Sequence, residues 1–153
     1  MLFVGINPSL WSGAVGLHFA RPGNRFWRAL NESGFTDRLL APHEGRELLK
    51  RRIGITNLVN RATASADELD GDQYRRGARR IEAMVRRYRP KVVAFVGMGA
   101  YRQAFNRPRA RGGRQQELLA GAVIWVLPNP SGRTAGYQMP ALAHAFRELR
   151  RSL

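Results

Sequence analysis

The sequence predicts a three-layer α/β/α sandwich built on a mostly parallel central sheet. Short apolar runs alternate with segments of helical periodicity along the whole chain, which is typical of βα units. The run at 92–96 is continuously apolar, as expected for a strand buried on both faces of a parallel sheet. The chain has 153 residues, so we expect a single domain over 1–153.

The first half of the chain predicts two strands and two helices. Leu2 to Ile6 is the first expected strand, and 7–23, which contains Gly13 and Gly16, is an expected loop. Asn24 can cap a helix that ends at Gly34. Proline at position 42 suits the first turn of a second helix reaching about residue 52. Residues 53–59 are then expected to form a short strand.

The second half continues the alternation. A helix is expected from about 73 to 89, where Pro90 ends it, and the strand 92–96 follows. A short helix should begin near Ala100. Residues 106–117 are rich in arginine and glycine and are an expected loop. The last strand is predicted at 123–127, and a helix over about 140–149 closes the chain.

Charge is strongly asymmetric. The chain has 26 basic and 11 acidic residues, a net charge of +15, and nearly all its basic residues are arginine. Such a surplus is typical of proteins that bind nucleic acid. A genome that favours arginine codons explains arginine over lysine, but it does not explain the scarcity of carboxylates. The stretch 107–114 is a candidate phosphate-contacting loop, with a merely solvated loop as the alternative.

Composition also excludes several kinds of protein. With no cysteine, disulfides, thiolate chemistry and thiolate-ligated zinc are excluded, and because the three histidines are far apart in sequence, a histidine-rich metal site is not expected. No apolar stretch approaches the roughly 20 residues of a membrane span, and no signal peptide opens the chain. We therefore expect a soluble, cytoplasmic protein. Because the first strand begins almost at Met1, a natural N-terminal extension is expected to be missing.

Two Asn-Pro turns follow apolar strands near opposite ends of the chain, at Asn7 and Asn129. Ligands of open α/β sheets sit beyond the carboxyl ends of strands, so the two turns are expected to meet at one crevice. An asparagine amide does not ionise usefully, but it can orient a water or hydrogen-bond a base edge. Pro8 restricts Asn7 to extended geometry and so aims its side chain.

Four spaced motifs together resemble one family. They are Gly5-Ile6-Asn7-Pro8, Phe19-Ala20-Arg21-Pro22-Gly23-Asn24-Arg25-Phe26-Trp27, Gly54-Ile55-Thr56-Asn57-Leu58-Val59 and Pro128-Asn129-Pro130-Ser131-Gly132. In order and spacing they resemble the mismatch-specific uracil-DNA glycosylases, the bacterial mismatch branch of the uracil/thymine-DNA glycosylase family. The resemblance implies one glycosylase domain over 1–153, without metal or cofactor. It implies a monomer with no obligate protein partner, whose partner is double-stranded DNA.

The implied reaction is hydrolysis of the glycosidic bond of uracil in G·U mispairs, after the nucleotide flips out of the duplex. Other modified pyrimidines such as ethenocytosine are implied as further substrates. Asn7 matches the catalytic asparagine that positions the attacking water. Ile6, through its backbone, and Phe19, as a stacking surface for the base, match the base pocket. Ser12 lies where it can adjust the catalytic asparagine.

Asn57 matches a pocket position where the thymine-DNA branch also has asparagine and some bacterial relatives have lysine. We assign it a catalytic role, with a simple strand-ending turn as the alternative. Residues 129–133 match the segment that enters the duplex, so we assign DNA wedge or backbone roles to four residues: Asn129, Ser131, Gly132 and Arg133. Bacterial relatives often have leucine in place of Arg133, but a guanidinium can stack and donate to the widowed guanine.

Four acidic residues cluster just before the predicted helix at 73–89: Asp67, Glu68, Asp70 and Asp72. Acids at a helix start favour its positive end, and the alternative is that one of them reaches the crevice. The main competing function is a non-catalytic mismatch or damaged-DNA binding module, which leaves the four motifs unexplained. A glycosylase acting on single strands is a second alternative. A Rossmann nucleotide site at 97–99 fails because Arg102 occupies the place of the third glycine.

Overall fold

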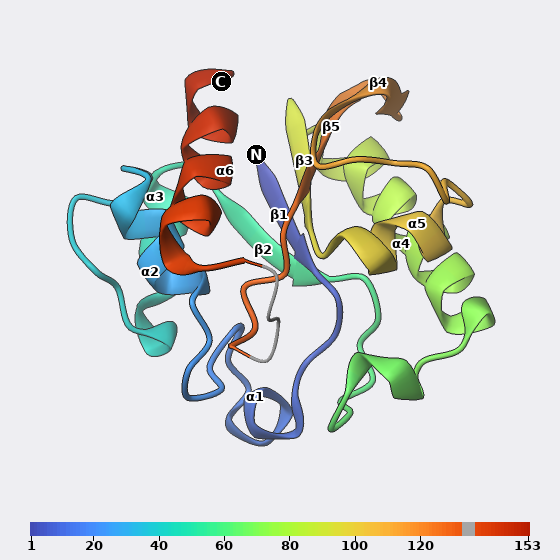
Figure 1. Ribbon diagram of the computed structural model, residues 1–153. Helices are drawn as coiled ribbons and strands as arrows, with labels where there is room; N and C mark the ends of the chain where they lie inside the picture. The colour runs from blue at the N-terminus through green and yellow to red at the C-terminus, as the bar shows by residue number, and fades with distance from the viewer. Residues whose placement is uncertain (133–136) are drawn as a thin grey trace.

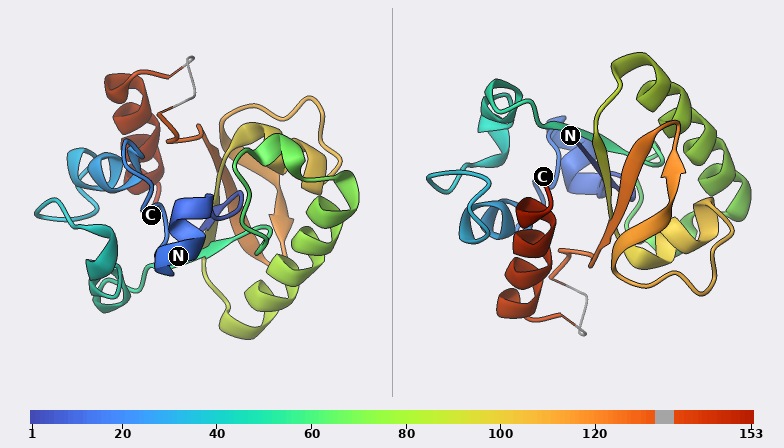
Figure 2. Two further views of the ribbon diagram at one scale, coloured as in Figure 1. Left: turned by 90° about the horizontal axis from the view of Figure 1, so that it is seen from below. Right: turned by 90° about the horizontal axis from the view of Figure 1, so that it is seen from above.

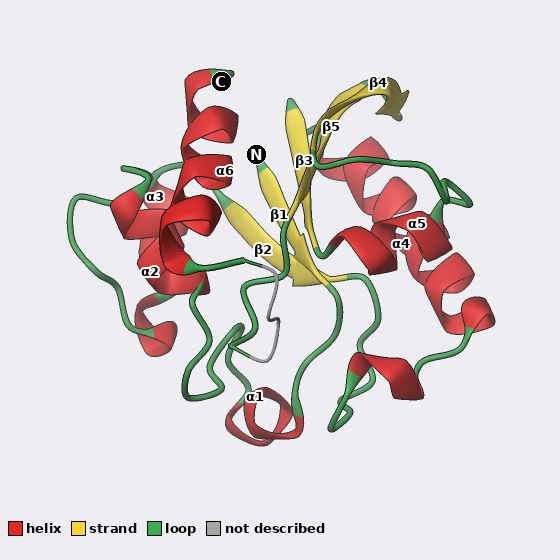
Figure 3. Cartoon of the chain, viewed as in Figure 1, coloured by secondary structure: helices red, strands yellow, loops and turns green. Residues whose placement is uncertain are grey.

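The computed structural model describes residues 1–132 and 137–153. Within these residues, five strands form one sheet in the order β2-β1-β3-β5-β4 (Figures 1 and 3). Strands β1 (Leu2–Gly5), β2 (Gly54–Asn57), β3 (Val92–Val96) and β5 (Ala122–Leu127) run parallel. Strand β4 (Gly113–Leu119) pairs with β5 in the antiparallel direction at the edge. The mostly parallel sheet confirms the predicted fold class.

Helices cover both faces of this sheet, as the two turned views show (Figure 2). One face is covered by α4 (Gly71–Tyr88) and α5 (Met98–Ala104). The other is covered by α2 (Phe26–Glu32), α3 (Glu47–Lys50) and α6 (Met139–Arg151). β3 serves both cores because its side chains alternate: Val93 and Phe95 pack on the first, and Val92, Ala94 and Val96 on the second.

Aromatic packing fixes the second core. The Phe3 ring lies edge-on to Phe26, with ring centroids 5.4 Å apart, and stacks on Phe146 of α6 at 5.9 Å. All three rings are fully buried. These contacts hold α2 against β1, and so they fix the start of α2 beside the carboxyl end of that strand.

Two predicted loops contain regular structure. Residues 7–23 include α1 (Leu10–Val15), which Ser9 caps by accepting a hydrogen bond from the Ser12 amide. The expected loop 106–117 gives way to β4 from Gly113 onward. A half-exposed edge strand carries polar residues on its outer side, and its composition therefore resembles that of a loop.

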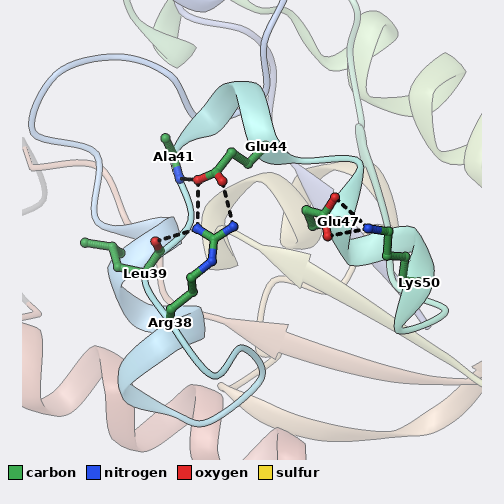
Figure 4. A network of polar contacts seen from close by, with 6 residues as sticks. All are labelled: Arg38, Leu39, Ala41, Glu44, Glu47 and Lys50. Carbon is green, nitrogen blue, oxygen red and sulfur yellow. Dashed lines mark hydrogen bonds and ion pairs between the residues drawn. The ribbon is translucent and has the colours of Figure 1, made fainter.

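The predicted helix from Pro42 to about residue 52 is wrong. The chain forms a 3-10 turn, η1 (Pro42–Glu44), and then the single turn α3. The Glu44 carboxylate folds back to accept from the Ala41 amide and from the Arg38 guanidinium (Figure 4). These contacts lie at the start of η1, which ends at Gly45, and α3 begins only at Glu47, so no continuous helix forms.

The remaining differences are small. Strand β2 is shorter than the predicted 53–59, and α5 begins at Met98 rather than Ala100. Asp70 caps α4, and a short 3-10 turn, η2 (Ala66–Glu68), precedes it. No helix in the described part of the chain is long and apolar enough to cross a membrane.

Candidate active site

A cavity of about 270 Å3 lies beyond the carboxyl ends of the parallel strands. Each of the four strands contributes to it: Asn7 follows β1, Asn57 ends β2, Val96 ends β3 and Asn129 follows β5. The parallel register explains this convergence, since Gly5 of β1 pairs with Asn57 of β2. The two Asn-Pro turns therefore share one cavity, near the lower limit of the roughly 300–1,000 Å3 seen for ligand pockets.

Asn7 is held rigidly by its amide nitrogen. Nδ2 donates to the Arg61 carbonyl at 2.9 Å and to Thr63 Oγ1 at 2.7 Å. Thr63 Oγ1 in turn donates to the Ser65 carbonyl at 2.7 Å. A backbone carbonyl only accepts, so this network fixes the amide orientation. Oδ1 of Asn7 is then the acceptor left for a ligand, since no described protein donor bonds to it.

The segment that carries Thr63 is pinned to the turn after β1. The Thr63 amide donates to the Pro8 carbonyl at 3.2 Å, and Thr63 pairs with Ser9 as an isolated parallel bridge. The Val59 amide also donates to the Ile6 carbonyl at 2.9 Å. The chain after β2 thus runs beside the chain after β1, and the Asn7 side chain bridges the two.

Asn57 is buried, with 9% of its surface exposed, and lines the same cavity. Its Oδ1 lies over Gly5, where an added Cβ would be only 2.6 Å away. Arg80 of α4 donates to the Asn57 carbonyl and so holds the end of β2. Gly77 lets α4 come close, since a Cβ there would lie 2.3 Å from the Leu58 carbonyl oxygen. The Asn57 side chain itself makes no hydrogen bond to the described protein.

Phe19 forms an aromatic wall of the cavity. Its ring stacks on Phe26 with a centroid separation of 3.9 Å and an angle of 15°. The backbone at Phe19 has a φ of 53°, in the left-handed region that costs a non-glycine residue energy. Ser12 supports this turn, because its buried Oγ accepts from the Ala20 amide at 3.1 Å. Ser12 therefore contacts the loop that carries Phe19, with no bond to Asn7.

The 129–132 segment packs beside the cavity, which Asn129 and Ser131 line. Asn129 Oδ1 accepts from the Ser131 amide at 3.0 Å and so closes a tight turn. Gly132 does not line the cavity, and a Cβ there would lie 2.9 Å from the Gly23 carbonyl oxygen. Arg133 lies outside the described residues.

Arg25 braces this segment, a role that the sequence did not indicate. Its guanidinium donates to three carbonyls, those of Pro130 at 3.2 Å, Ser131 at 2.7 Å and Tyr137 at 2.6 Å. The acceptors lie on both sides of 133–136. One side chain at the start of α2 thus fixes the segment to the aromatic core.

Of the four clustered acids, Asp67 alone lines the cavity, where its carboxylate accepts from Ser65 Oγ at 3.1 Å. Glu68 accepts from the Ser65 amide, Asp70 caps α4 and Asp72 pairs with Arg75. His18 also lines the cavity, and burial lowers the pKa of its imidazole. In the described ranges, no three His, Cys, Asp or Glu residues gather as metal ligands.

The model of the uracil DNA glycosylase superfamily matches residues 1–151. The chain belongs to this superfamily. Membership indicates a DNA glycosylase, a hydrolase with uracil glycosylase activity in DNA repair, and its fold agrees with the α/β architecture described above. DNA is accordingly the partner to be sought at the cavity of this glycosylase.

The glycosylase cavity contains residues that the motifs did not identify. Thr63 and Ser65 form the support of Asn7, and His18 and Asp67 form part of the wall. No local signal marks Thr63, because it lies 56 positions after Asn7 and meets it only through strand pairing. His18 was not identified from the sequence either, although it immediately precedes the Phe19 motif.

Proposed function

We propose that this protein is a monofunctional, mismatch-specific uracil-DNA glycosylase. Its substrate is double-stranded DNA with uracil, or another modified pyrimidine such as ethenocytosine, opposite guanine. The target nucleotide leaves the base stack and enters the cavity. Unpairing costs a few kcal/mol, and a mispair lowers this cost, which favours G·U over A·U. The protein acts as a monomer, without a metal or cofactor.

The single observation that carries the proposal is the fixed amide of Asn7. Both Nδ2 hydrogens are bonded to protein acceptors, so Oδ1 is left as a hydrogen-bond acceptor of fixed orientation at the cavity. A water that donates one hydrogen to Oδ1 keeps an oxygen lone pair free to attack the anomeric carbon. As the water oxygen bonds to C1′, the C1′–N1 bond breaks and its electron pair leaves with the uracil. One water proton stays on the new C1′ hydroxyl, and the other passes to solvent or to the departing base.

Asn7 orients the water without being a strong base. A carboxylate acting as general base contributes about 10²- to 10⁴-fold, and a neutral amide forgoes much of that gain. The proposal therefore includes slow turnover. The negative charge on the leaving uracil must be stabilised by fixed dipoles of the site, a role suited to Asn57, whose side-chain amide has no other described partner.

Phe19 completes the base site in this proposal. One face of its ring is stacked on Phe26. The ring also lines the cavity, where a planar pyrimidine can stack in turn. The turn at Asn129 and Ser131 is proposed to contact the DNA backbone, and Arg133 to fill the space left by the flipped nucleotide.

The test is single-turnover release of uracil from a labelled G·U duplex, with DNA binding measured in parallel. The wild-type protein should release the base, and Asn7→Ala should lose about two orders of magnitude in rate while still binding. Asn60→Ala is the matched control, since Asn60 is an exposed asparagine just beyond β2 and does not line the cavity.

Substrate comparison completes the test. G·U should be cleaved faster than A·U or single-stranded uracil, and equal rates would contradict mismatch specificity. Binding without release by the wild type on any of these substrates would favour the non-catalytic binding module. Equal release by wild type and Asn7→Ala would move the catalytic role to another group.

A further inference from the structure

The outer face of α1 is apolar and exposed. Leu10, Trp11 and Val15 are 57%, 55% and 46% exposed, and Ala14 between them is exposed as well. Single exposed apolar side chains are ordinary on protein surfaces. Three large ones on a helix of six residues form a patch, and such patches mark surfaces that contact a partner.

The patch cannot turn inward, because the inner face of α1 is already used. Ser9 caps the helix, and the buried Ser12 bonds to the Ala20 amide. Gly13 packs so closely on Ala62 that a Cβ there would lie 2.8 Å from the Ala62 methyl. The helix is therefore fixed, and its apolar residues stay at the surface.

This surface lies at the rim of the cavity. Ser9 and Ser12 line the cavity from the inner side of α1, and the helix projects beyond the carboxyl ends of the strands (Figures 1 and 3). The inner side of α1 is thus cavity wall, and its outer side is the adjoining outer surface. A strand that delivers a nucleotide into the cavity crosses its rim, and α1 forms one side of that rim.

Charge identifies what the patch can contact. No residue from 2 to 20 carries a charge at neutral pH, because His18 is the one titratable side chain there and burial lowers its pKa. Arg21 lines the cavity just after this stretch, and Arg61 is exposed beside Asn7. Phosphates are bound by such guanidinium groups, whereas an uncharged apolar face suits bases and sugars. A second copy would bring another +15 against the first, which disfavours self-association.

We propose that α1 is a DNA-contacting element, in which Trp11 stacks on a base or sugar next to the flipped nucleotide. Leu10 and Val15 extend the same apolar contact. The proposal rests on the proposed function for the choice of DNA as partner. It adds a contact beside the cavity that is separate from the water-positioning and wedge residues.

Trp11 provides its own probe. The other two tryptophans, Trp27 and Trp125, are only 5% and 9% exposed, so quenching by acrylamide reports mainly on Trp11. The ligand is a duplex with a tetrahydrofuran abasic analogue opposite guanine, which cannot be turned over. We expect binding of this duplex to quench Trp11 fluorescence and to protect it from acrylamide.

Substitution gives an independent readout by fluorescence anisotropy. Trp11→Ala should weaken duplex binding by about tenfold or more, the size of one lost base–aromatic stack. Trp11→Phe should retain most of the affinity. The matched controls are Tyr88→Ala and Leu118→Ala, which remove exposed side chains near the opposite ends of the strands and should leave binding unchanged.

Affinity equal to wild type in Trp11→Ala, with Trp11 still open to acrylamide in the complex, would overturn the proposal. Protection of Trp11 at rising protein concentration without DNA would also overturn it, because that result assigns the face to a second copy. Base release by the wild type is measured separately. Protection by DNA without any base release would refute the glycosylase assignment alone, whereas release without protection would refute the α1 contact alone.

Discussion

Thr63 is the residue through which the segment after β2 holds the Asn7 side chain. It accepts from Asn7 Nδ2 and donates to the Ser65 carbonyl, so one hydroxyl joins the amide to the following backbone. A hydroxyl serves both bonds at once, which explains why a threonine suits a buried position beside a polar cavity.

Replacing Thr63 by valine keeps the shape and removes both hydrogen bonds. We expect uracil release to slow by about three- to tenfold, the value of the lost hydrogen bond to Asn7, with DNA binding unchanged. Thr63→Ser should restore most of the rate because it keeps the hydroxyl. Single-turnover rates on the G·U duplex measure this, and a valine variant as fast as wild type would show that the Arg61 bond alone holds Asn7.

Gly5 is the second residue on which the site depends. An added methyl at this position would lie 2.6 Å from Asn57 Oδ1 and 3.0 Å from the Phe19 ring. We expect Gly5→Ala to cost about 1–3 kcal/mol in unfolding free energy, as overpacking does, and to reduce base release further by displacing both side chains. Urea unfolding and single-turnover rates measure the two effects. Gly16→Ala tests backbone strain in open space as a comparison, and unchanged activity in Gly5→Ala would contradict the close packing.

At the scale of elements, an ion pair between Arg38 and Glu44 closes the turn that leads into η1. The Glu44 carboxylate accepts from the Arg38 guanidinium at 2.7 and 3.1 Å and from the Ala41 amide at 2.9 Å (Figure 4). Arg38 and the Ala41 amide lower the pKa of Glu44 from 4.5 to about 2. The carboxyl group therefore binds protons less readily in the folded than in the unfolded chain.

This shift predicts one contribution to the acid sensitivity of the fold. Above about pH 4.5 the charged Glu44 stabilises the native state, and this stabilisation is lost as the pH falls toward about 2. Glu44→Gln should remove that part of the pH dependence, so its unfolding curves should approach those of wild type at low pH. Glu47→Gln is the control, since Glu47 pairs with Lys50 at an exposed site. Urea unfolding at several pH values provides the measurement, and parallel profiles for wild type and Glu44→Gln would refute it.

Helices and strands were predictable from the sequence where their own residues show the apolar pattern typical of a buried strand or an amphipathic helix. The apolar runs at β1, β3 and β5 indicated buried parallel strands, and the periodicity of α4 indicated its helix. The helix α1 was not predicted, because its exposed face is apolar and its buried residue is a serine, the reverse of the usual helical pattern. Strand β4 was predicted as a loop, because its polar residues face solvent and its strand structure depends on pairing with β5.

The residues of the candidate site also fall into those that the sequence identified and those that it did not. The motif positions Asn7, Phe19, Asn57 and Asn129 were identified from sequence, and the structure places all four around one cavity. Thr63 and Arg25 were missed because each acts on groups more than 50 positions away in the chain. Such contacts arise from the parallel order of the strands, which brings distant turns to one edge.

At the scale of the whole molecule, we expect the net charge of +15 to favour encounter with DNA. We expect log affinity to fall linearly with log salt, with a slope of about −0.9 for each phosphate contacted. Arg61→Gln, beside the cavity, should make this slope shallower by about 1, whereas Arg87→Gln at the far end of α4 should not. Anisotropy titrations over a range of salt concentrations measure it, and an affinity independent of salt would contradict an electrostatic contact.

The bracing by Arg25 has a consequence for how this protein can evolve. The guanidinium grips main-chain oxygens of Pro130, Ser131 and Tyr137, and every residue type offers such an oxygen. These three hydrogen bonds therefore do not depend on which side chains stand at the accepting positions. A substitution of Arg25 removes all three hydrogen bonds at once, so the placement of the cavity-lining turn depends on a single side chain.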